Sequence, residues 1–209
     1  MMLFSATYKA QVVEFATKIV KDPMIIRLRR QDESLSSIQQ FFVQCDSFET
    51  KYIALSNIYG LITVGQSIIF CQSRQTAKDL TVRLNDDGIP AELLSGELAV
   101  EQRADVIKRF RDGLSKMLVT TNVTARGIDI DDVNLVINFD LPLNYDRTPD
   151  YETYLHRIGR TGRFGKSGVA INFVDPNSMN VLGKIQKHFG RVIEKLDATN
   201  PEAIEKIAL

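Results

Sequence analysis

Ser67-Ile68-Ile69-Phe70-Cys71 is a continuous, largely apolar run about one third of the way along the chain. A strand that is apolar at successive positions is buried on both sides, which is typical of parallel sheets covered by helices. Amphipathic helices are predicted on either side of this run, at residues 49–59 and 74–87. The run therefore predicts an α/β fold in which helices cover both faces of a parallel sheet.

The same alternation of strands and helices continues to the end of the chain. Further strands are predicted at residues 38–45, 91–94, 117–120, 133–138, 169–174 and 193–196, and further helices at 100–111, 178–189 and 201–207. Pro149-Asp150 opens one more helix, with Asp150 as its N-cap. In the helix at 100–111, four residues are expected to face the core: Val100, Ala104, Ile107 and Phe110.

The first 37 residues are organised differently. A strand at 2–7, a helix at 9–20 and a strand at 24–28 precede the charged, aperiodic stretch Arg29–Ser37, which we interpret as a linker. The main domain is therefore predicted to cover residues 38–209, with residues 1–30 belonging to something else.

Composition narrows the classes of function. Lys+Arg and Asp+Glu both number 26, so a nucleic-acid site would have to be a local patch rather than a uniformly basic surface. Cys45 and Cys71 lie in apolar contexts and are expected to be buried, reduced thiols of an intracellular protein. The two cysteines and two histidines lack zinc-ligand spacing. No apolar run approaches the roughly 18 residues of a membrane span, so we expect no membrane insertion and a cytoplasmic or nuclear location.

Polar loops follow several of the predicted strands. These loops are Ser73-Arg74, Ser95-Gly96-Glu97 and Thr120–Asp129. In open parallel sheets, ligands bind beyond the carboxyl ends of the strands, so we expect these loops to line one groove. Arg126 could pair with a phosphate and Asp129 with ribose hydroxyls, although for this loop taken alone a capped turn, with Asp129 bonding nearby amides, is the favoured interpretation.

The stretch Tyr154–Gly165 contains three arginines at three-residue spacing: Arg157, Arg160 and Arg163. If the helix continued through them, they would share a face, and guanidinium groups suit the binding of phosphate. We expect this segment to join the loops at the same edge of the sheet and to neutralise charge in phosphoryl transfer. A solvated basic helix end that complements its own dipole is the alternative.

The spelling and order of these motifs resemble a known family. They are Phe4-Ser5-Ala6-Thr7, Ile69–Ser73, Thr121–Asp129, Asn138-Phe139-Asp140-Leu141-Pro142 and His156–Arg163. Over nearly the whole chain, the pattern resembles the superfamily 2 helicases and, within them, the DEAD-box ATP-dependent RNA helicases. Three stretches are similar to the mRNA-export branch at the nuclear pore: Asn57–Thr63, Leu143–Tyr151 and Glu205-Lys206-Ile207.

The resemblance implies a two-lobed enzyme, of which residues 38–209 would be the RecA-like C-terminal lobe and residues 1–30 the end of the first lobe. It implies that Arg160 and Arg163 reach the γ-phosphate of ATP as catalytic residues, together with His156. Gly127, Asp129 and Arg157 would complete this lobe's part of the nucleotide site, with His156 and Arg157 also coupling the lobes.

The resemblance also implies contacts to the backbone of single-stranded RNA. The matching residues are Ser73, Arg74, Gly96, Arg103, Thr121 and Arg126. Contacts to the backbone rather than to bases would make binding largely independent of sequence.

Two motifs of the family do not occur in these 209 residues. They contain no Gly-x-x-x-x-Gly-Lys-Ser/Thr loop and no Asp-Glu-Ala-Asp. We therefore expect Mg²⁺ and the triphosphate to be held by the first lobe, no metal site in this chain, and negligible ATP hydrolysis by the chain alone. Without partner strands, residues 1–30 are expected to be disordered, to dock elsewhere on the domain or to mediate a dimer.

Two alternatives remain at this stage. The chain could be a catalytically inactive docking module for a nuclear-pore export activator at the cytoplasmic face of the pore, aided by inositol hexakisphosphate. The candidate residues are Lys184, Lys187, His188 and Arg191, for which a solvated helix face is the favoured interpretation. The loops alone would also fit a lobe of a superfamily 2 DNA helicase.

Overall fold

A computed structural model describes residues 1–4, 10–26, 37–62, 64–122, 133–162 and 167–207. The chain forms two compact units, Met1–Glu33 and Ser34–Leu209. In the first unit, helix α1 (Ala10–Ile19) agrees with the predicted helix. Residues 1–4 and 24–26 are not strands, so the described parts of the strands predicted at 2–7 and 24–28 are wrong. A strand is stable only when it is hydrogen-bonded to neighbouring strands. The described part of this unit offers no such neighbours to residues 1–4 and 24–26.

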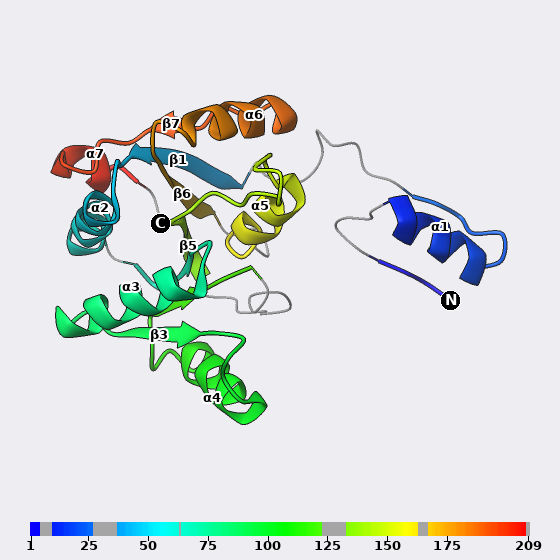
Figure 1. Ribbon diagram of the computed structural model, residues 1–209, viewed down its shortest axis with the longest axis horizontal. Helices are drawn as coiled ribbons and strands as arrows, with labels where there is room; N and C mark the ends of the chain where they lie inside the picture. Colours follow the sequence, from blue (N-terminus) through cyan, green and yellow to red (C-terminus); the bar gives the residue numbers. More distant parts are fainter. Residues whose placement is uncertain (5–9, 27–36, 63, 123–132, 163–166, 208–209) are drawn as a thin grey trace. The chain divides into compact units, whose positions relative to one another are not determined.

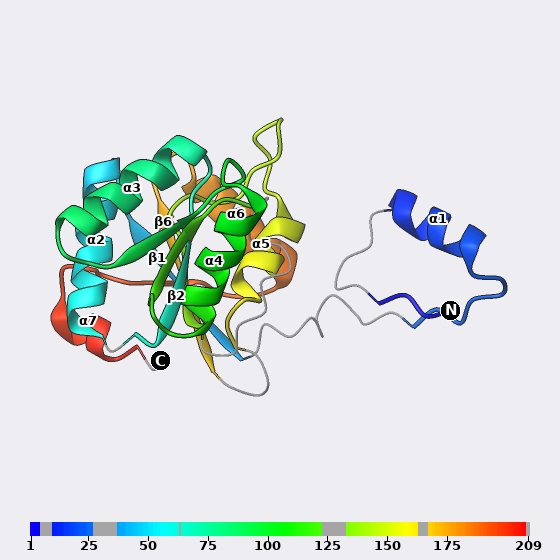
Figure 2. The ribbon, with the colours of Figure 1, turned by 90° about the horizontal axis from the view of Figure 1, so that it is seen from below.

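The second unit is built on a parallel sheet (Figures 1 and 2). Its described strands lie in the order β3-β4-β2-β5-β6-β1-β7. They are β1 (Ile38–Gln44), β2 (Gln66–Phe70), β3 (Ala91–Leu94), β4 (Met117–Thr120), β5 (Val133–Asn138), β6 (Gly168–Val174) and β7 (Glu194–Lys195). The continuous run at 67–71 becomes β2, which pairs with β4 on one side and β5 on the other and is buried at every position.

Helices cover both faces of this sheet (Figures 1 and 2). One core contains side chains of α2 (Phe48–Leu61), α3 (Arg74–Asp86) and α7 (Pro201–Glu205). The opposite face is covered by α4 (Val100–Arg111), α5 (Tyr151–Ile158) and α6 (Met179–Phe189). Along β2, Ile69 belongs to the first core and its neighbours Ile68 and Phe70 to the second, as the alternation of a strand requires. The α/β fold class is confirmed.

The inward face of α4 differs from the prediction. Val106 and Phe110 are buried and Ile107 is partly buried, whereas Val100 is 66% exposed and Ala104 is exposed. Val100 is the first residue of the helix, and its apolar side chain did not indicate burial.

Both cysteines are buried and free, as expected. Burial raises the pKa of the Cys45 thiol to about 11 and raises that of Cys71 further.

Candidate functional site

Three loops that carry predicted RNA-binding residues share one edge of the sheet. Ser73, Gly96 and Thr121 follow β2, β3 and β4, which are neighbours in a parallel sheet. Ser73 and Gly96 are exposed and Thr121 is partly buried. The expectation that these loops gather at the carboxyl edge agrees with the structure, while their contact with RNA stays a prediction.

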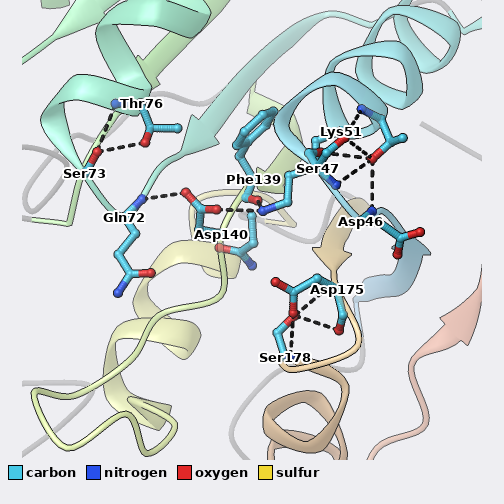
Figure 3. Close-up of polar contacts among 12 residues, drawn as sticks. Asp46, Ser47, Lys51, Gln72, Ser73, Thr76, Phe139, Asp140, Asp175 and Ser178 are labelled. Atoms are coloured by element: carbon cyan, nitrogen blue, oxygen red, sulfur yellow. Dashed lines mark hydrogen bonds and ion pairs between the residues drawn. The ribbon is translucent and has the colours of Figure 1, made fainter.

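The first of these loops is held in shape by a helix cap. Ser73 is the N-cap of α3, and its Oγ accepts a hydrogen bond from the backbone N of Thr76 at 2.9 Å (Figure 3). Arg74 pairs with Glu97 of the next loop, with Nη1 3.3 Å from Oε1. Both of these side chains are well exposed, so the pair contributes roughly 0–1 kcal/mol and Arg74 could exchange it for a phosphate.

Arg103 projects from the first turns of α4, the helix that follows Gly96. Its Nε is buried and makes no hydrogen bond within the part of the chain that the structure describes. Thr120 links the ends of β4 and β3, because its Oγ1 donates to the carbonyl oxygen of Leu94 at 2.9 Å. A buried, unsatisfied guanidinium N–H is costly, and an anionic ligand would satisfy it.

Helix α5 begins as predicted but ends too early for the predicted arrangement of arginines. Asp150 caps it, with Oδ1 accepting from the backbone N of Thr153 at 2.9 Å. The helix ends at Ile158 with Gly159 as C-cap, and Arg160 lies in the turn that follows. The helix therefore does not continue through Arg157 and Arg160, which was the condition for the two to share a helical face.

The turn after α5 also lies away from the three loops. Gly162 adopts φ +69°, and a Cβ there would come within 2.8 Å of Ile38 Cγ1 at the start of β1. The N–H of Gly168, at the start of β6, donates to the Ser37 carbonyl oxygen at 3.0 Å. Because α5 must run back along the sheet to reach the parallel strand β6, it carries the turn toward the amino edge. The prediction of one shared edge holds for the loops and is wrong for the segment 160–162.

Arg157 is an interior residue, with only 2% of its surface exposed. Its Nε donates to Asn122 Oδ1 at 2.7 Å, and its Nη1 donates to Asn138 Oδ1 at 2.8 Å and to the Asp140 carbonyl oxygen at 2.6 Å. The guanidinium also lies 5.0 Å from the centre of the Phe70 ring. Burial lowers the pKa of Arg157 to about 10, so the side chain remains charged at neutral pH. Arg157 Nη2 is also buried, and it has no hydrogen-bond partner within the part of the chain that the structure describes. The contact with a nucleotide that the resemblance implies for Arg157 stays a prediction.

A chain of buried polar side chains extends from Arg157 across the sheet. Asn138 Nδ2 donates to Asn172 Oδ1 at 2.8 Å, and Asn172 Nδ2 contacts the Tyr154 hydroxyl at 3.2 Å. The Tyr154 hydroxyl in turn donates to Gln40 Oε1 at 2.8 Å. The sequence analysis named Asn138 and Tyr154 only as members of longer motifs and did not predict this network. The signal was asparagine at two positions within otherwise apolar strands, since a buried amide requires partners.

Arg160 is partly buried, and its Nε donates to the carbonyl oxygen of His156 at 3.1 Å. Burial lowers its pKa. His156 is partly exposed. Four predicted site residues lie outside the described residues: Arg126, Gly127, Asp129 and Arg163.

Two further observations concern only the described residues. Among them, no three or more His, Cys, Asp or Glu side chains are grouped so that they could hold a metal ion. No helix there is both long and apolar enough to span a membrane.

Comparison with known proteins places the chain in a family. The model of the helicase conserved C-terminal domain matches residues 50–165, more than half of the chain. The chain belongs to this family. ATP-dependent RNA helicase DDX19A of Bos taurus is 57% identical to this helicase lobe over 209 residues, which are 100% of this chain and 44% of that protein.

Solved structures agree with the sequence match. S. cerevisiae Dbp5 bound to RNA and ADP BeF3 is 42% identical, with a TM-score of 0.89 over 97% of this chain and 52% of that chain. A variant of the C-terminal domain of Dbp5, a DEAD-box protein, bound to a Gle1 variant and IP6, is 43% identical, with a TM-score of 0.74 over 81% of this chain and 95% of that chain. The helicase lobe therefore has the RecA-like fold of a DEAD-box C-terminal domain, and it spans about half the length of DDX19A and of Dbp5.

Proposed function

We propose that this lobe supplies one side of the ATP site and half of the RNA groove in an ATP-dependent RNA helicase that remodels RNA or RNA–protein complexes in mRNA export. The observation that carries the proposal is the similarity, over 97% of this chain, to Dbp5 bound to RNA and ADP BeF3. Membership of the RNA helicases favours this function over that of a DNA helicase lobe.

Arg160 and Arg163 would donate hydrogen bonds to the γ-phosphate, because a guanidinium keeps its charge and matches phosphate geometry. Such arginines contribute roughly 10³–10⁵ in rate when the nucleotide is already held. Bound ATP supplies the transferred phosphoryl group. The described residues offer no donor set for Mg²⁺, which we propose is held by the first lobe.

The RNA groove would use Ser73, Gly96 and Thr121 for backbone contacts, with Arg74, Arg103 and Arg126 as phosphate partners. Two facts support this part of the proposal. Among the described residues, Arg74 forms an ion pair with Glu97 that is well exposed, and Arg103 Nε has no hydrogen-bond partner there. Single-stranded RNA would therefore bind with a marked dependence on salt.

The test is ATP turnover by the full-length protein. Arg160→Ala should reduce RNA-stimulated turnover by about 10³-fold or more, with little change in melting temperature. Arg109→Ala, which removes a surface arginine paired with Glu92 at 2.9 Å, is the matched control and should retain normal turnover. Normal turnover in Arg160→Ala would refute the proposal.

The 209-residue chain alone is expected to release phosphate from ATP no faster than a protein-free control, because an arginine finger cannot act on a nucleotide that nothing holds. Rapid phosphate release by the purified chain, retained through further purification, would contradict the division of the site between two lobes.

A second candidate function is docking of an export activator with the help of an inositol phosphate. Lys184, Lys187 and Arg191 are exposed on and after α6, and His188 stacks on Tyr151 with ring centres 3.8 Å apart. The structure of the Dbp5 C-terminal domain variant with a Gle1 variant and IP6 favours this candidate. It would locate the protein in cytoplasm and nucleus, at the cytoplasmic face of the nuclear pore.

Calorimetric titration of this chain with inositol hexakisphosphate and a Gle1 relative tests the docking function. Lys184→Glu/Lys187→Glu should weaken binding at least tenfold, about 1.4 kcal/mol. Lys78→Glu/Lys108→Glu changes the net charge equally on exposed positions of α3 and α4 and should bind normally. Absence of saturable binding by the unmodified chain would exclude this function.

A further inference from the structure

Asp140 divides its hydrogen bonds among several elements (Figure 3). It lies two residues beyond β5, and its Oδ1 accepts from Lys51 Nζ of α2 at 2.7 Å. Its Oδ2 accepts from the backbone N of Gln72 at 3.0 Å, and its carbonyl oxygen accepts from Arg157 Nη1 at 2.6 Å. The side chains of Lys51 and Asp140 are only 14% and 21% exposed, so water screens their attraction weakly.

Each of these contacts leads to a different part of the proposed site. Gln72 immediately precedes Ser73 and Arg74 at the carboxyl edge of the sheet. Arg157 lies in α5, and its carbonyl oxygen accepts from the backbone N of Arg160 at 3.1 Å in the turn that runs toward the amino edge. The loop at Ser73 and the turn at Arg160 are thus joined through Asp140, whose side chain contacts Gln72 and whose carbonyl oxygen contacts Arg157.

The surroundings of Asp140 make this joint stiff. Lys51 Nζ also donates to the carbonyl oxygen of Phe139 at 2.7 Å and lies 5.2 Å from the centre of the Phe139 ring. The backbone N of Asp140 donates to the Phe70 carbonyl oxygen at 3.3 Å. Because the main chain of Asp140 is hydrogen-bonded to β2 on one side and to α5 on the other, Asp140 cannot follow a movement of Gln72 without disturbing Arg157.

We infer that Asp140 is a positioning residue that couples RNA binding at the Ser73 loop to nucleotide binding at the Arg160 turn. The inference rests on the function proposed above and assigns to this one carboxylate the link between its two halves. By linkage, RNA then raises the affinity for nucleotide by the same factor as nucleotide raises the affinity for RNA.

The coupling factor can be measured in the full-length protein. Fluorescence anisotropy gives the affinity for a labelled single-stranded RNA with and without ADP–beryllium fluoride, and the ratio is the factor. Asp140→Ala should lower it by roughly fivefold or more, while RNA affinity without nucleotide changes by less than about twofold. Asp140→Asn keeps one acceptor oxygen for two donors and should lower the factor by a smaller amount.

Two controls separate positioning from mere stability. Asp175 follows β6 at the same edge, and its Oδ1 accepts from the backbone N of Ser178 at 2.7 Å, so Asp175→Ala removes a carboxylate that does not bridge the loops (Figure 3). Lys51→Met removes the ion pair but leaves the hydrogen bonds of Asp140 to Gln72 and Arg157. Both variants should lower the melting temperature and retain most of the coupling factor.

An unchanged coupling factor in Asp140→Ala would overturn the inference; if that variant is unfolded at the assay temperature, an unchanged factor in Asp140→Asn decides in the same way. Equal losses in Asp140→Ala and Asp175→Ala would also overturn it. Arg160→Ala distinguishes the two proposals: if it abolishes turnover while Asp140→Ala couples normally, this inference alone fails.

Discussion

Arg157 shows how a charged residue can be kept inside a small lobe. An arginine that is 2% exposed loses its hydration, and its hydrogen bonds to Asn122, Asn138 and Asp140 replace part of it. Asn138 and Asn172 cost less than the burial of a lone amide because each satisfies the other. A network of this kind is specific only while every member is present.

Asn138→Ala should destabilise the lobe by about 2 kcal/mol or more, since it deprives the buried Arg157 and Asn172 of a partner at once. Urea unfolding of this chain, followed by circular dichroism, measures the effect. Asn180→Ala, at an exposed position of α6, is the control and should change stability by less than about 0.5 kcal/mol. Equal stability of the two variants would contradict the importance of the network.

Cys45 provides a prediction about pH. Burial raises its pKa from 9.0 to about 11, so the folded protein holds about 100-fold less thiolate at pH 8 than the unfolded chain. The pKa of Cys45 is higher in the folded protein than in the unfolded chain. The contribution of its protonated thiol to stability is therefore complete below about pH 9 and is lost as the pH rises through 11. Reaction with an aromatic disulfide reagent at pH 8 should be slow in buffer and fast in urea. Rapid labelling of the folded protein would contradict the burial of both thiols.

At the scale of the elements, the direction of α5 decides where its arginines lie. Parallel strands oblige the connecting helix to return to the opposite edge, so the turn at 160–162 packs against the starts of β1 and β6. Ser37 reinforces this contact through its Oγ, which donates to the Gly162 carbonyl oxygen at 3.2 Å. Glycine at 162 thus has a structural reason that does not depend on a ligand.

Gly162→Ala should destabilise the lobe by about 2 kcal/mol, because the left-handed backbone and the contact with Ile38 both oppose a Cβ. Gly183→Ala is the matched control. A Cβ at that position of α6 would meet nothing within 4 Å, so alanine should stabilise the helix by about 0.5–1 kcal/mol. Thermal unfolding of both variants tests the difference in sign, and two shifts of the same sign would refute it.

At the scale of the whole molecule, the core belongs to the second unit. Every buried apolar side chain among the described residues lies at Ile38 or later. In the first unit, α1 leaves Val12, Phe15 and Ile19 largely exposed, so its apolar face is not buried within the described part of that unit. Its assignment as the end of a first helicase lobe remains a prediction.

A chain of residues 34–209 should therefore have nearly the same stability as the 209-residue chain, within about 0.5 kcal/mol. Urea denaturation of the two proteins measures this difference, with the free energy of unfolding taken to depend on urea concentration with the same slope in both. A loss of about 2 kcal/mol or more on removing residues 1–33 would show that the first unit contributes packing to the second.

Most elements of the second unit could be predicted, because their signals are local. The apolar run at 67–71 became β2 at 66–70, and Asp150 caps α5 as its position before the helix indicated. The loops after β2, β3 and β4 could be assigned to one edge because parallel strands all point the same way. The motifs in these loops also indicated the family, which the helicase C-terminal match confirms.

By itself, then, the order of residues determined the elements, the parallel sheet and the helicase family, since each depends on neighbours within one strand, helix or loop. Only the tertiary structure decided that Arg157 is buried, that Arg160 turns toward the amino edge and that Asp140 joins Gln72 to Arg157. These arrangements depend on contacts between residues far apart in the chain, such as Ser37 with Gly162 and Gln72 with Asp140. Local periodicity carries no information about such contacts, because they form only when the sheet brings distant segments together.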